Sequence, residues 1–342
     1  NTFDWLLSEK KSIRAVWTPG LTEDMFNRTV NIDYKLLGER CKKLCEKYEN
    51  AVSVHVTSPG GTDIVVGLKG RKGMVDDGDF SKPGSGGNIP AGETFISPVV
   101  GTCEGTIVFD GSMTFSDGDS ILKTPICVKV EKGFVSEVTG EEEAKRLLTD
   151  IQQAEKDAVS MENSGKLPKG QGEIYAKNAR NIGELGIGLN PAAGITGNML
   201  EDEKAFRTCH FAIGENYDGD APSLIHFDGV VKEPSIVIKY EDGTEFDTRP
   251  IYVRTNGHID GHFTTCFTAL VLIRLLQVKL ENKYTVGKLL TSLKKYNCVH
   301  LDKNNYQFVY NDEIIISISK SFNINLSAKY KTSNEIRRLL KY

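Results

Sequence analysis

The sequence lacks several features that would place the chain in a specialised class of protein. No apolar run approaches the roughly 20 residues that a membrane-spanning helix needs, and the longest, residues 267–276, is interrupted by Arg274. The N-terminus has neither the basic nor the apolar segment of a secretory signal, and the seven cysteines show no paired spacing. We therefore expect a cytoplasmic protein with reduced thiols and no membrane partner.

Glycine and acidic residues are scarce in the last part of the chain. Only three of the 33 glycines follow residue 245, and this stretch carries 15 Lys and Arg against seven Asp and Glu. Its net charge is therefore +8, whereas residues 1–245 carry −12. A change of this size predicts two structural units, residues 1–245 and 246–342. With 26% charged and 39% hydrophobic residues, neither disorder nor a fibrous repeat is expected.

The pattern of apolar residues predicts a mixed α+β fold with a β-rich body and a small, basic, mainly helical C-terminal unit. Residues 52–138 consist of short β-type runs separated by glycine-rich turns. Helical spacing predicts helices that end near residue 50, at 141–159 and at 201–208. In the C-terminal unit we expect helices at 261–280 and from 285, and strands at 307–310 and 314–316.

Two of the six histidines have neighbours that suggest a metal site. If the run that ends at His226 is a strand, then His226 and Asp228, two residues apart, face the same side. His210 lies sixteen residues earlier. Two imidazoles and a carboxylate are suitable ligands for Zn²⁺, Co²⁺ or a similar ion. A lone His-x-Asp is a weak signal, because a buried histidine paired with an aspartate is commoner than a metal ligand.

Two glutamates are candidates to complete this site. Glu93 follows Asn-Ile-Pro-Ala-Gly, and Glu184 lies inside Gly-Glu-Leu-Gly-Ile-Gly. Each lies in tightly turning backbone before apolar residues, where an unpaired charge is costly. A cation should therefore meet them, and the alternatives are a metal pair bridged by carboxylate or a basic side chain, namely Arg71, Arg180 or Lys204.

The body also resembles a known family, the metal-dependent aminopeptidases of the aminopeptidase T and aminopeptidase S type. The resemblance covers residues 17–240 and rests on ordered blocks of sequence. These blocks are Trp17–Gly20, Pro59–Asp63, Gly78–Gly84, Asn88–Glu93, Ile107–Met113, Ala179–Asn190, Ile195–Lys204, His210–Gly214 and His226–Gly229. The resemblance implies an exopeptidase that hydrolyses the first peptide bond of peptides with a free N-terminus, and it favours a homodimer.

The resemblance also implies roles for individual residues. The metal ligands would be Glu93, Glu184, His210, His226 and Asp228, and Tyr217 would donate a hydrogen bond to the oxyanion. Two divalent ions, Zn²⁺ or Co²⁺ with Mg²⁺ or Mn²⁺ as the other candidates, would activate a bridging water. One of the two glutamates would be the general base, and no organic cofactor is implied.

Both ends of the chain depart from this family. The region before Trp17 is shorter than in family members, which suggests a truncated N-terminal lobe. Residues 246–342 resemble instead the C-terminal end of a DDE-type insertion-sequence transposase without its catalytic acids. We expect at most weak, non-specific binding of nucleic acid by this basic tail. The alternative to an active aminopeptidase is thus a catalytically impaired fusion or fragment, the product of an aminopeptidase gene interrupted by a transposase remnant.

Overall fold

The computed structural model describes residues 12–248, 256–302 and 304–339. The chain divides into two compact units, Asn1–Pro250 and Ile251–Tyr342. The division lies five residues beyond the change in composition at residue 245. Among the described residues, no helix is long and apolar enough to cross a membrane.

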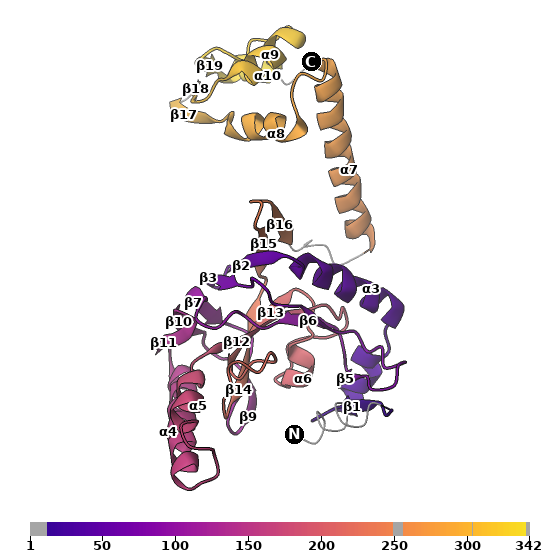
Figure 1. Cartoon of the computed structure of the whole chain (residues 1–342). Coiled ribbons are helices and arrows are strands. Elements are labelled where there is room, and N and C mark those ends of the chain that lie inside the picture. The colour runs from indigo at the N-terminus through magenta and orange to yellow at the C-terminus, as the bar shows by residue number, and fades with distance from the viewer. Residues whose placement is uncertain (1–11, 249–255, 303, 340–342) are drawn as a thin grey trace. The chain divides into compact units, whose positions relative to one another are not determined.

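The first unit is built on two antiparallel sheets of seven strands each. Short strands occur between residues 52 and 138 as predicted; some of them belong to the second sheet, and five belong to the first. The strand order of the first sheet is β11 (Phe134–Thr139), β10 (Ile126–Glu131), β7 (Glu104–Phe109), β3 (Asp63–Gly67), β2 (Ala51–Thr57), β15 (Ser235–Tyr240) and β16 (Glu245–Thr248). Figure 1 shows these strands on one side of the unit.

The second sheet carries the residues that matter for function. Its order is β4 (Met74–Asp76), β6 (Glu93–Ile96), β12 (Ile182–Gly188), β13 (Thr208–Gly214), β14 (His226–Lys232), β8 (Ser112–Phe115) and β9 (Gly118–Ile121). A short parallel pair, β1 (Ala15–Trp17) with β5 (Gly86–Asn88), lies outside both sheets. The central strands β12 and β13 are buried along their whole length.

One hydrophobic core joins the two sheets. Side chains of the first sheet, such as Val54 and Ile107, belong to the same buried cluster as Leu185 and Phe211 of the second. Alternation along each strand turns these apolar side chains inward. Burying this apolar area supplies the main driving force that holds the sheets together.

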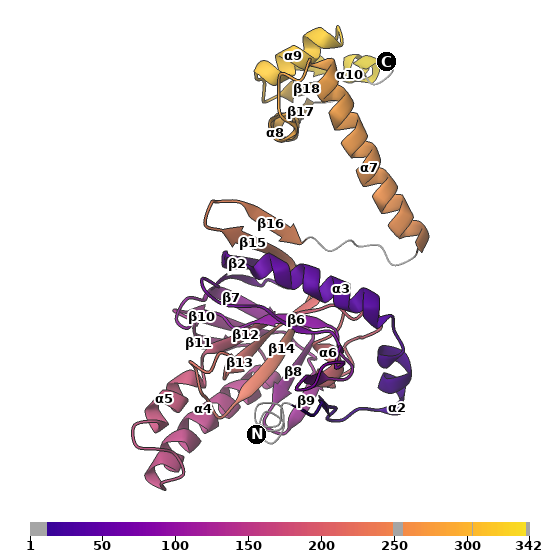
Figure 2. The same ribbon diagram turned by 45° about the vertical axis from the view of Figure 1, so that its right-hand side comes forward.

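Helices cover the edges of this core. The chain passes through α2 (Glu23–Met25), capped by Thr22, and a π-helical turn (Phe26–Val30) into α3 (Tyr34–Cys45), which a short 3₁₀ turn (Glu46–Tyr48) extends. Leu37 and Cys41 of α3 face the core. The predicted helix at 141–159 is α4 (Glu142–Asn163), and α5 (Gly172–Asn178) lies beside it (Figure 2).

The helix predicted at 201–208 is wrong in extent. Only α6 (Met199–Asp202) is helical, with Asn198 as its N-cap. The helix ends at its C-cap Glu203, and the chain turns through residues 203–207, where Arg207 has a φ of 72°, before it enters β13 at Thr208. The stretch around Glu184, which we read as a glycine-rich turn, is the buried strand β12.

The second unit is a small mixture of helices and strands. It comprises α7 (Asn256–Lys279), α8 (Val286–Lys295), α9 (Glu313–Ser321), α10 (Ser333–Leu339) and a three-stranded sheet of β17 (Cys298–Asp302), β18 (Asn305–Phe308) and β19 (Tyr330–Thr332). A second cluster of buried apolar residues, including Ile273, Leu289 and Ile315, holds α7, α8 and α9 together.

One strand predicted in this unit is wrong. Residues 314–316 lie in α9, because Asp312 caps the helix by accepting a hydrogen bond of 2.8 Å from the Ile315 amide. An N-cap carboxylate before a short apolar run is enough to favour the helix. The predicted helices at 261–280 and from 285 occur as α7 and α8, and residues 249–253 of the transposase-like stretch lie outside the described residues.

Candidate metal centre

Four adjacent strands bring the five predicted ligands together. Glu93 begins β6, Glu184 lies in β12, His210 in β13, and His226 and Asp228 begin β14. Because β6, β12, β13 and β14 are neighbours in the second sheet, residues far apart in sequence meet on one face. His226 and Asp228 are separated by one residue of a strand, so they share that face as expected.

A glycine opposite His210 makes room for its imidazole. Gly186 of β12 pairs with His210 in the sheet, and a Cβ at residue 186 would lie 2.1 Å from the ring. No other residue type fits here without moving the ring. The glycines of this strand therefore serve close packing around the site, and they explain why its sequence reads as a turn.

The distances between the donor atoms suit a bound cation. His210 Nε2 lies 3.2 Å from Glu184 Oε1 and 3.4 Å from Glu93 Oε2. His226 Nε2 lies 3.4 Å from Glu184 Oε2 and 3.4 Å from Asp228 Oδ1. Ligand atoms about 2.1 Å from one ion are roughly 3.0–3.4 Å from each other in octahedral or tetrahedral geometry.

Buried oxygens without a hydrogen bond support this interpretation. Glu93 Oε2 and Asp228 Oδ1 are buried and accept no hydrogen bond, and each lies 3.4 Å from an imidazole nitrogen; such an arrangement costs free energy unless a cation meets the oxygens. His226 is held through its other nitrogen, because Nδ1 lies 2.9 Å from the Glu215 carbonyl oxygen. This contact directs Nε2 toward the carboxylates, as the outer partners of metal-binding histidines do.

The histidines and the carboxylates of the centre shift each other's pKa values. Burial alone would lower the pKa of His210, but Glu184 and Glu93 outweigh burial and raise it. Burial alone would raise the pKa of Glu184, but His210 and His226 outweigh it and lower that pKa. The site thus strongly favours a positive charge between its carboxylates.

A lysine and two further acids adjoin the predicted ligands. Lys204 is fully buried, with Nζ 2.7 Å from Glu93 Oε1 and 3.7 Å from Asp76 Oδ2, and it also pairs with Glu203. Of the three basic partners considered for the glutamates, Lys204 is therefore the one that reaches Glu93. Arg71 pairs with Asp218 and Asp220, and Arg180 pairs with Glu155.

The sequence interpretation missed Glu203 and Asp76. Glu203, Glu93 and His210 form a second group of side chains able to hold a metal, beside the group of Glu184, His226 and Asp228. The only signal for Glu203 was its position next to Lys204 in the acidic run Glu-Asp-Glu-Lys. Burial and the charge of Glu93 raise its pKa to about 8, despite the nearby Lys204.

Tyr217 lies at the edge of the centre. Its ring is 5.5 Å from the His226 ring and 5.1 Å from the Phe95 ring, centroid to centroid, and 61% of the residue is exposed. It is close enough to contact a molecule bound at the centre. Its role as a hydrogen-bond donor stays a prediction.

A pocket of about 400 Å³ opens onto the centre at Asp228 and Glu203. Its remaining polar side chains are Asn88, Thr114, Asp119 and Asn198, and its apolar ones are Pro19, Met199 and Leu200. This volume lies in the range of small-molecule sites. The pocket therefore offers a small ligand direct access to the candidate metal ligands.

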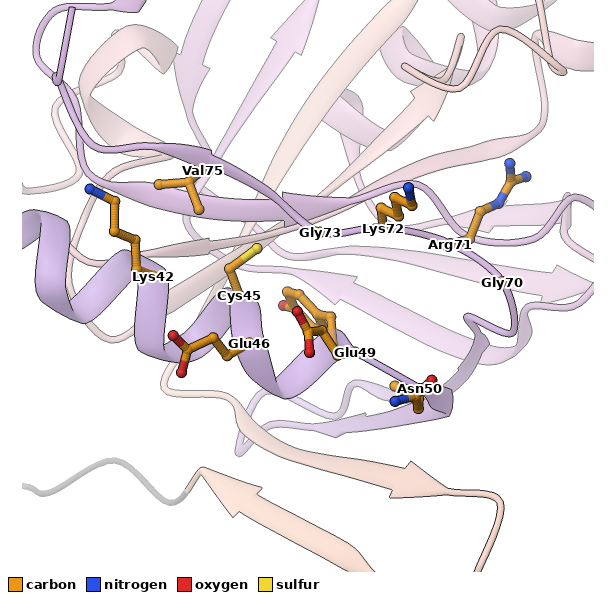
Figure 3. Close-up of a pocket in the computed structure, with 12 residues that line it drawn as sticks. Lys42, Cys45, Glu46, Glu49, Asn50, Gly70, Arg71, Lys72, Gly73 and Val75 are labelled. Atoms are coloured by element: carbon orange, nitrogen blue, oxygen red, sulfur yellow. The ribbon is translucent and has the colours of Figure 1, made fainter. Parts of the chain in front are cut away.

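A larger hollow of about 760 Å³ lies elsewhere on the first unit (Figure 3). The end of α3 and the segment between β3 and β4 form its walls, with Lys42, Glu46 and Arg71 among its charged side chains. None of the candidate metal ligands lines it. We therefore place the functional site at the smaller pocket.

Comparison with known proteins points to one family. The sequence matches the model of the NicX family, described as 2,5-dihydroxypyridine 5,6-dioxygenase, over residues 24–237. It is 27% identical over 154 residues to the 2,5-dihydroxypyridine 5,6-dioxygenase of Pseudomonas putida KT2440. That match covers 45% of this chain and 38% of the relative, so the chain spans about two fifths of the relative's length.

One solved structure among those similar to this chain shares its fold. The 2,5-dihydroxypyridine dioxygenase of Pseudomonas putida KT2440 has a TM-score of 0.55 at 20% identity, over 73% of this chain and 68% of that chain. AmpT from Thermus thermophilus has a TM-score of 0.46 at 21% identity, over 63% of this chain and 53% of that chain. The likeness to AmpT is too low to support an assignment.

The family match corrects the activity expected from the sequence. We expected a metallo-aminopeptidase, a hydrolase acting on peptides, or an impaired form of one, but the matching family is described as a dioxygenase family. The donor set of histidines and carboxylates suits either chemistry, so the residue types alone did not separate the two. The match spans more than half of the chain, and the protein therefore belongs to the NicX family of 2,5-dihydroxypyridine 5,6-dioxygenases.

Proposed function

We propose that the chain is a metal-dependent dioxygenase that opens a hydroxylated pyridine ring, with Fe²⁺ in place of the Zn²⁺ or Co²⁺ expected from the sequence. One observation carries this proposal: two imidazoles and adjoining carboxylates converge on one face of the sheet in a chain of this family. Two histidines and a carboxylate with open positions are the typical ligand set of non-haem Fe²⁺ oxygenases.

The proposed ligands are His210 and His226, with carboxylate oxygens from Glu184 and Asp228. Glu184 lies between the two imidazoles, one oxygen 3.2 Å from His210 and the other 3.4 Å from His226. Asp228 brings a buried oxygen that accepts no hydrogen bond and lies 3.4 Å from His226 Nε2. A bound iron supplies the electron chemistry with dioxygen that amino-acid side chains lack.

The residues of the chain have the remaining tasks of binding and orientation. The pocket beside Asp228 holds the ring next to the ligands. Lys204 fixes the direction of Glu93 through a contact of 2.7 Å, and the Glu215 carbonyl fixes that of His226. Tyr217 offers its ring at the rim of the site, 5.5 Å from His226, where an aromatic ligand is able to pack against it.

Oxygen uptake tests the proposal. We expect the anaerobically Fe²⁺-loaded full chain to consume one O₂ for each 2,5-dihydroxypyridine lost, and a chelator to abolish this activity. Folded protein with one or more irons per chain that consumes neither oxygen nor ring would refute the proposed reaction.

A variant tests the ligand set separately. His226→Ala should lower the affinity for Fe²⁺ at least tenfold, because one of two imidazoles is lost. The matched control is His55→Ala, since His55 lies in β2 and pairs only with Asp63, at 2.7 Å, among the contacts of the described residues. Equal iron content in the two variants would exclude His226 as a ligand.

A further inference from the structure

The loop between β13 and β14, residues 215–225, carries two groups that face the metal centre. The carbonyl oxygen of Glu215 lies 2.9 Å from His226 Nδ1. Two residues later, Tyr217 places its ring 5.5 Å from the ring of His226 and 5.1 Å from that of Phe95. Because 61% of Tyr217 is exposed, the position of its ring depends on the position of the loop.

Hydrogen bonds within the loop give it a defined shape. Strand pairing fixes both of its ends. Asn216 Oδ1 accepts hydrogen bonds of 3.1 Å from the amides of Gly219 and Ala221. Its Nδ2 donates to Asp220 Oδ1 at 2.6 Å. Gly219 has a φ of 76°, which a glycine adopts without strain in a tight turn. These bonds act inside the loop, so they set its shape rather than its place against the sheets.

Arg71 attaches the outer turn of this loop to the rest of the first unit. It lies between β3 and β4. Its Nη2 is 2.8 Å from Asp220 Oδ2, and its Nη1 is 3.5 Å from Asp218 Oδ2. Nη2 also donates to the carbonyl oxygen of Pro98, beyond the end of β6, at 3.0 Å. We call these three contacts the Arg71 clamp, because one guanidinium joins three segments that are far apart in the sequence.

The Arg71 clamp acts on both neighbours of Tyr217. Asp218 follows Tyr217 and pairs with Arg71, and Asn216 precedes it and binds the second partner of Arg71, Asp220. Exposed ion pairs contribute little to stability, but the side chain of Arg71 is only 12% exposed. A guanidinium that is held in place loses little conformational freedom for each contact it makes.

We propose that Arg71 is a positioning residue that holds the ring of Tyr217 at the rim of the metal centre. This inference rests on the proposed function for the task of Tyr217, which is to pack against the bound aromatic ring. The partners of Arg71 are Asp218, Asp220 and Pro98, so it acts through the loop. Its loss should loosen Tyr217, whereas the proposed metal ligands stay on their strands.

Kinetics separate this role from a general effect on folding. In the Fe²⁺-loaded full chain, Arg71→Met should raise the KM for 2,5-dihydroxypyridine about fivefold, the size of one weakened ring contact, and change kcat less than about twofold. Anaerobic calorimetry of the same protein should show the same rise in Kd. Arg71→Lys keeps the charge but not the planar fork, so it should recover part of the affinity.

Arg180→Met is the matched control. Arg180 also pairs with an acid, Glu155, and donates to a backbone carbonyl oxygen, that of Val135, at 3.3 Å. Neither partner belongs to the loop, so KM and Kd should not change. A Kd of Arg71→Met equal to that of the unmodified chain would overturn the inference.

A double variant shows whether Arg71 acts through Tyr217. In that case, Arg71→Met combined with Tyr217→Ala should bind 2,5-dihydroxypyridine no more weakly than Tyr217→Ala alone, because the ring to be positioned is already absent. Losses that add up in the double variant would show that Arg71 acts by another route and would overturn the inference.

Hydrogen exchange tests the Arg71 clamp without any ligand. Arg71→Met should speed the exchange of the Gly219 and Ala221 amides, which the Asn216 side chain protects. Unchanged exchange would overturn the inference whatever the chain binds. If Arg71→Met fails to fold, Asp218→Asn with Asp220→Asn removes the same ion pairs from side chains that are 36% and 50% exposed, and the same results are expected.

Failure of the proposed function and failure of this inference give different results. A chain whose loop exchange responds to Arg71→Met, but which neither binds nor consumes the ring, supports the positioning role and refutes the dioxygenase. Ring consumption with KM, Kd and loop exchange unaffected by Arg71→Met does the opposite.

Discussion

Removal of the buried lysine gives the sharpest test of the electrostatics of the site. Lys204→Met keeps the length of the side chain but leaves Glu93, Glu203 and Asp76 without their shared ammonium. At an effective dielectric constant near 20, the contacts of 2.7 Å with Glu93 and 3.7 Å with Asp76 correspond to roughly 6 and roughly 4.5 kcal/mol of attraction. Desolvation of the lysine offsets much of this attraction.

The net loss should be about 3–5 kcal/mol, the usual cost of breaking a buried ion pair from one side. For a unit of this size, such a loss lowers the melting temperature of the metal-free protein by roughly 10 °C. Urea and thermal denaturation of chelator-treated protein measure it. Lys69→Met is the matched control, because Lys69 pairs with Glu241 at 2.8 Å on the surface, and its midpoint should not change.

A double variant separates lost charge from lost packing. Lys204→Met combined with Glu93→Gln removes both partners of the 2.7 Å contact, so the two changes should be less than additive by about 2 kcal/mol. Strict additivity, or a loss below about 1 kcal/mol for Lys204→Met alone, would show that Lys204 does not balance these carboxylates.

Three further predictions concern other parts of the chain. Gly186→Ala should displace the His210 ring, because a Cβ at residue 186 would lie 2.1 Å from it, and should lower the bound iron per chain. Gly287→Ala, where a Cβ meets open space, should leave the bound iron unchanged. Equal iron contents in the two variants would refute the steric argument. Truncation after Pro250 should preserve metal binding measured by elemental analysis, because every proposed ligand lies in the first unit, and loss of the metal would show that the second unit completes the site. Iodoacetamide at pH 7.5 followed by peptide mapping should modify the exposed Cys298, and early labelling of the buried thiols would contradict the structure. Alkylation should spare the buried thiols of Cys41, Cys103 and Cys209, because burial raises the pKa of each. The pKa is raised to about 12 for Cys41 and for Cys103.

The sequence predicted the position of the site better than its chemistry. The spacing of His226 and Asp228 shows that they face the same side of a strand, and the cost of burying Glu93 and Glu184 implies a cation near them. The structure brings all four residues and His210 together. Their assignment as ligands of a hydrolytic centre came from the resemblance to aminopeptidases, and the family match contradicts that activity.

The failures have physical causes that short-range patterns do not contain. Glu203 gains its importance from its contacts with Lys204 and its place beside Glu93. Lys204 and Glu93 are 111 residues apart in the sequence, so local spacing does not reveal that they meet. Residues 314–316 have the composition of a strand but follow the helix cap Asp312. The resemblance of the tail to a transposase fragment, its weak binding of nucleic acid and a homodimer stay predictions.

The last strand of the first sheet, β16, covers a sheet edge that would otherwise be open to pairing with other molecules. β16 pairs with β15 along four residues, from Ile236↔Thr248 to Lys239↔Glu245, and it begins where the composition changes. Without it, the backbone groups of the apolar strand β15 would form an open edge, a template for strand addition between molecules. Glu245 and Asp247 place negative charge on the new edge and discourage further addition. Residues 245–248 therefore protect the acidic body from aggregation. A chain truncated after residue 244 should aggregate, whereas a chain truncated after residue 250 should not.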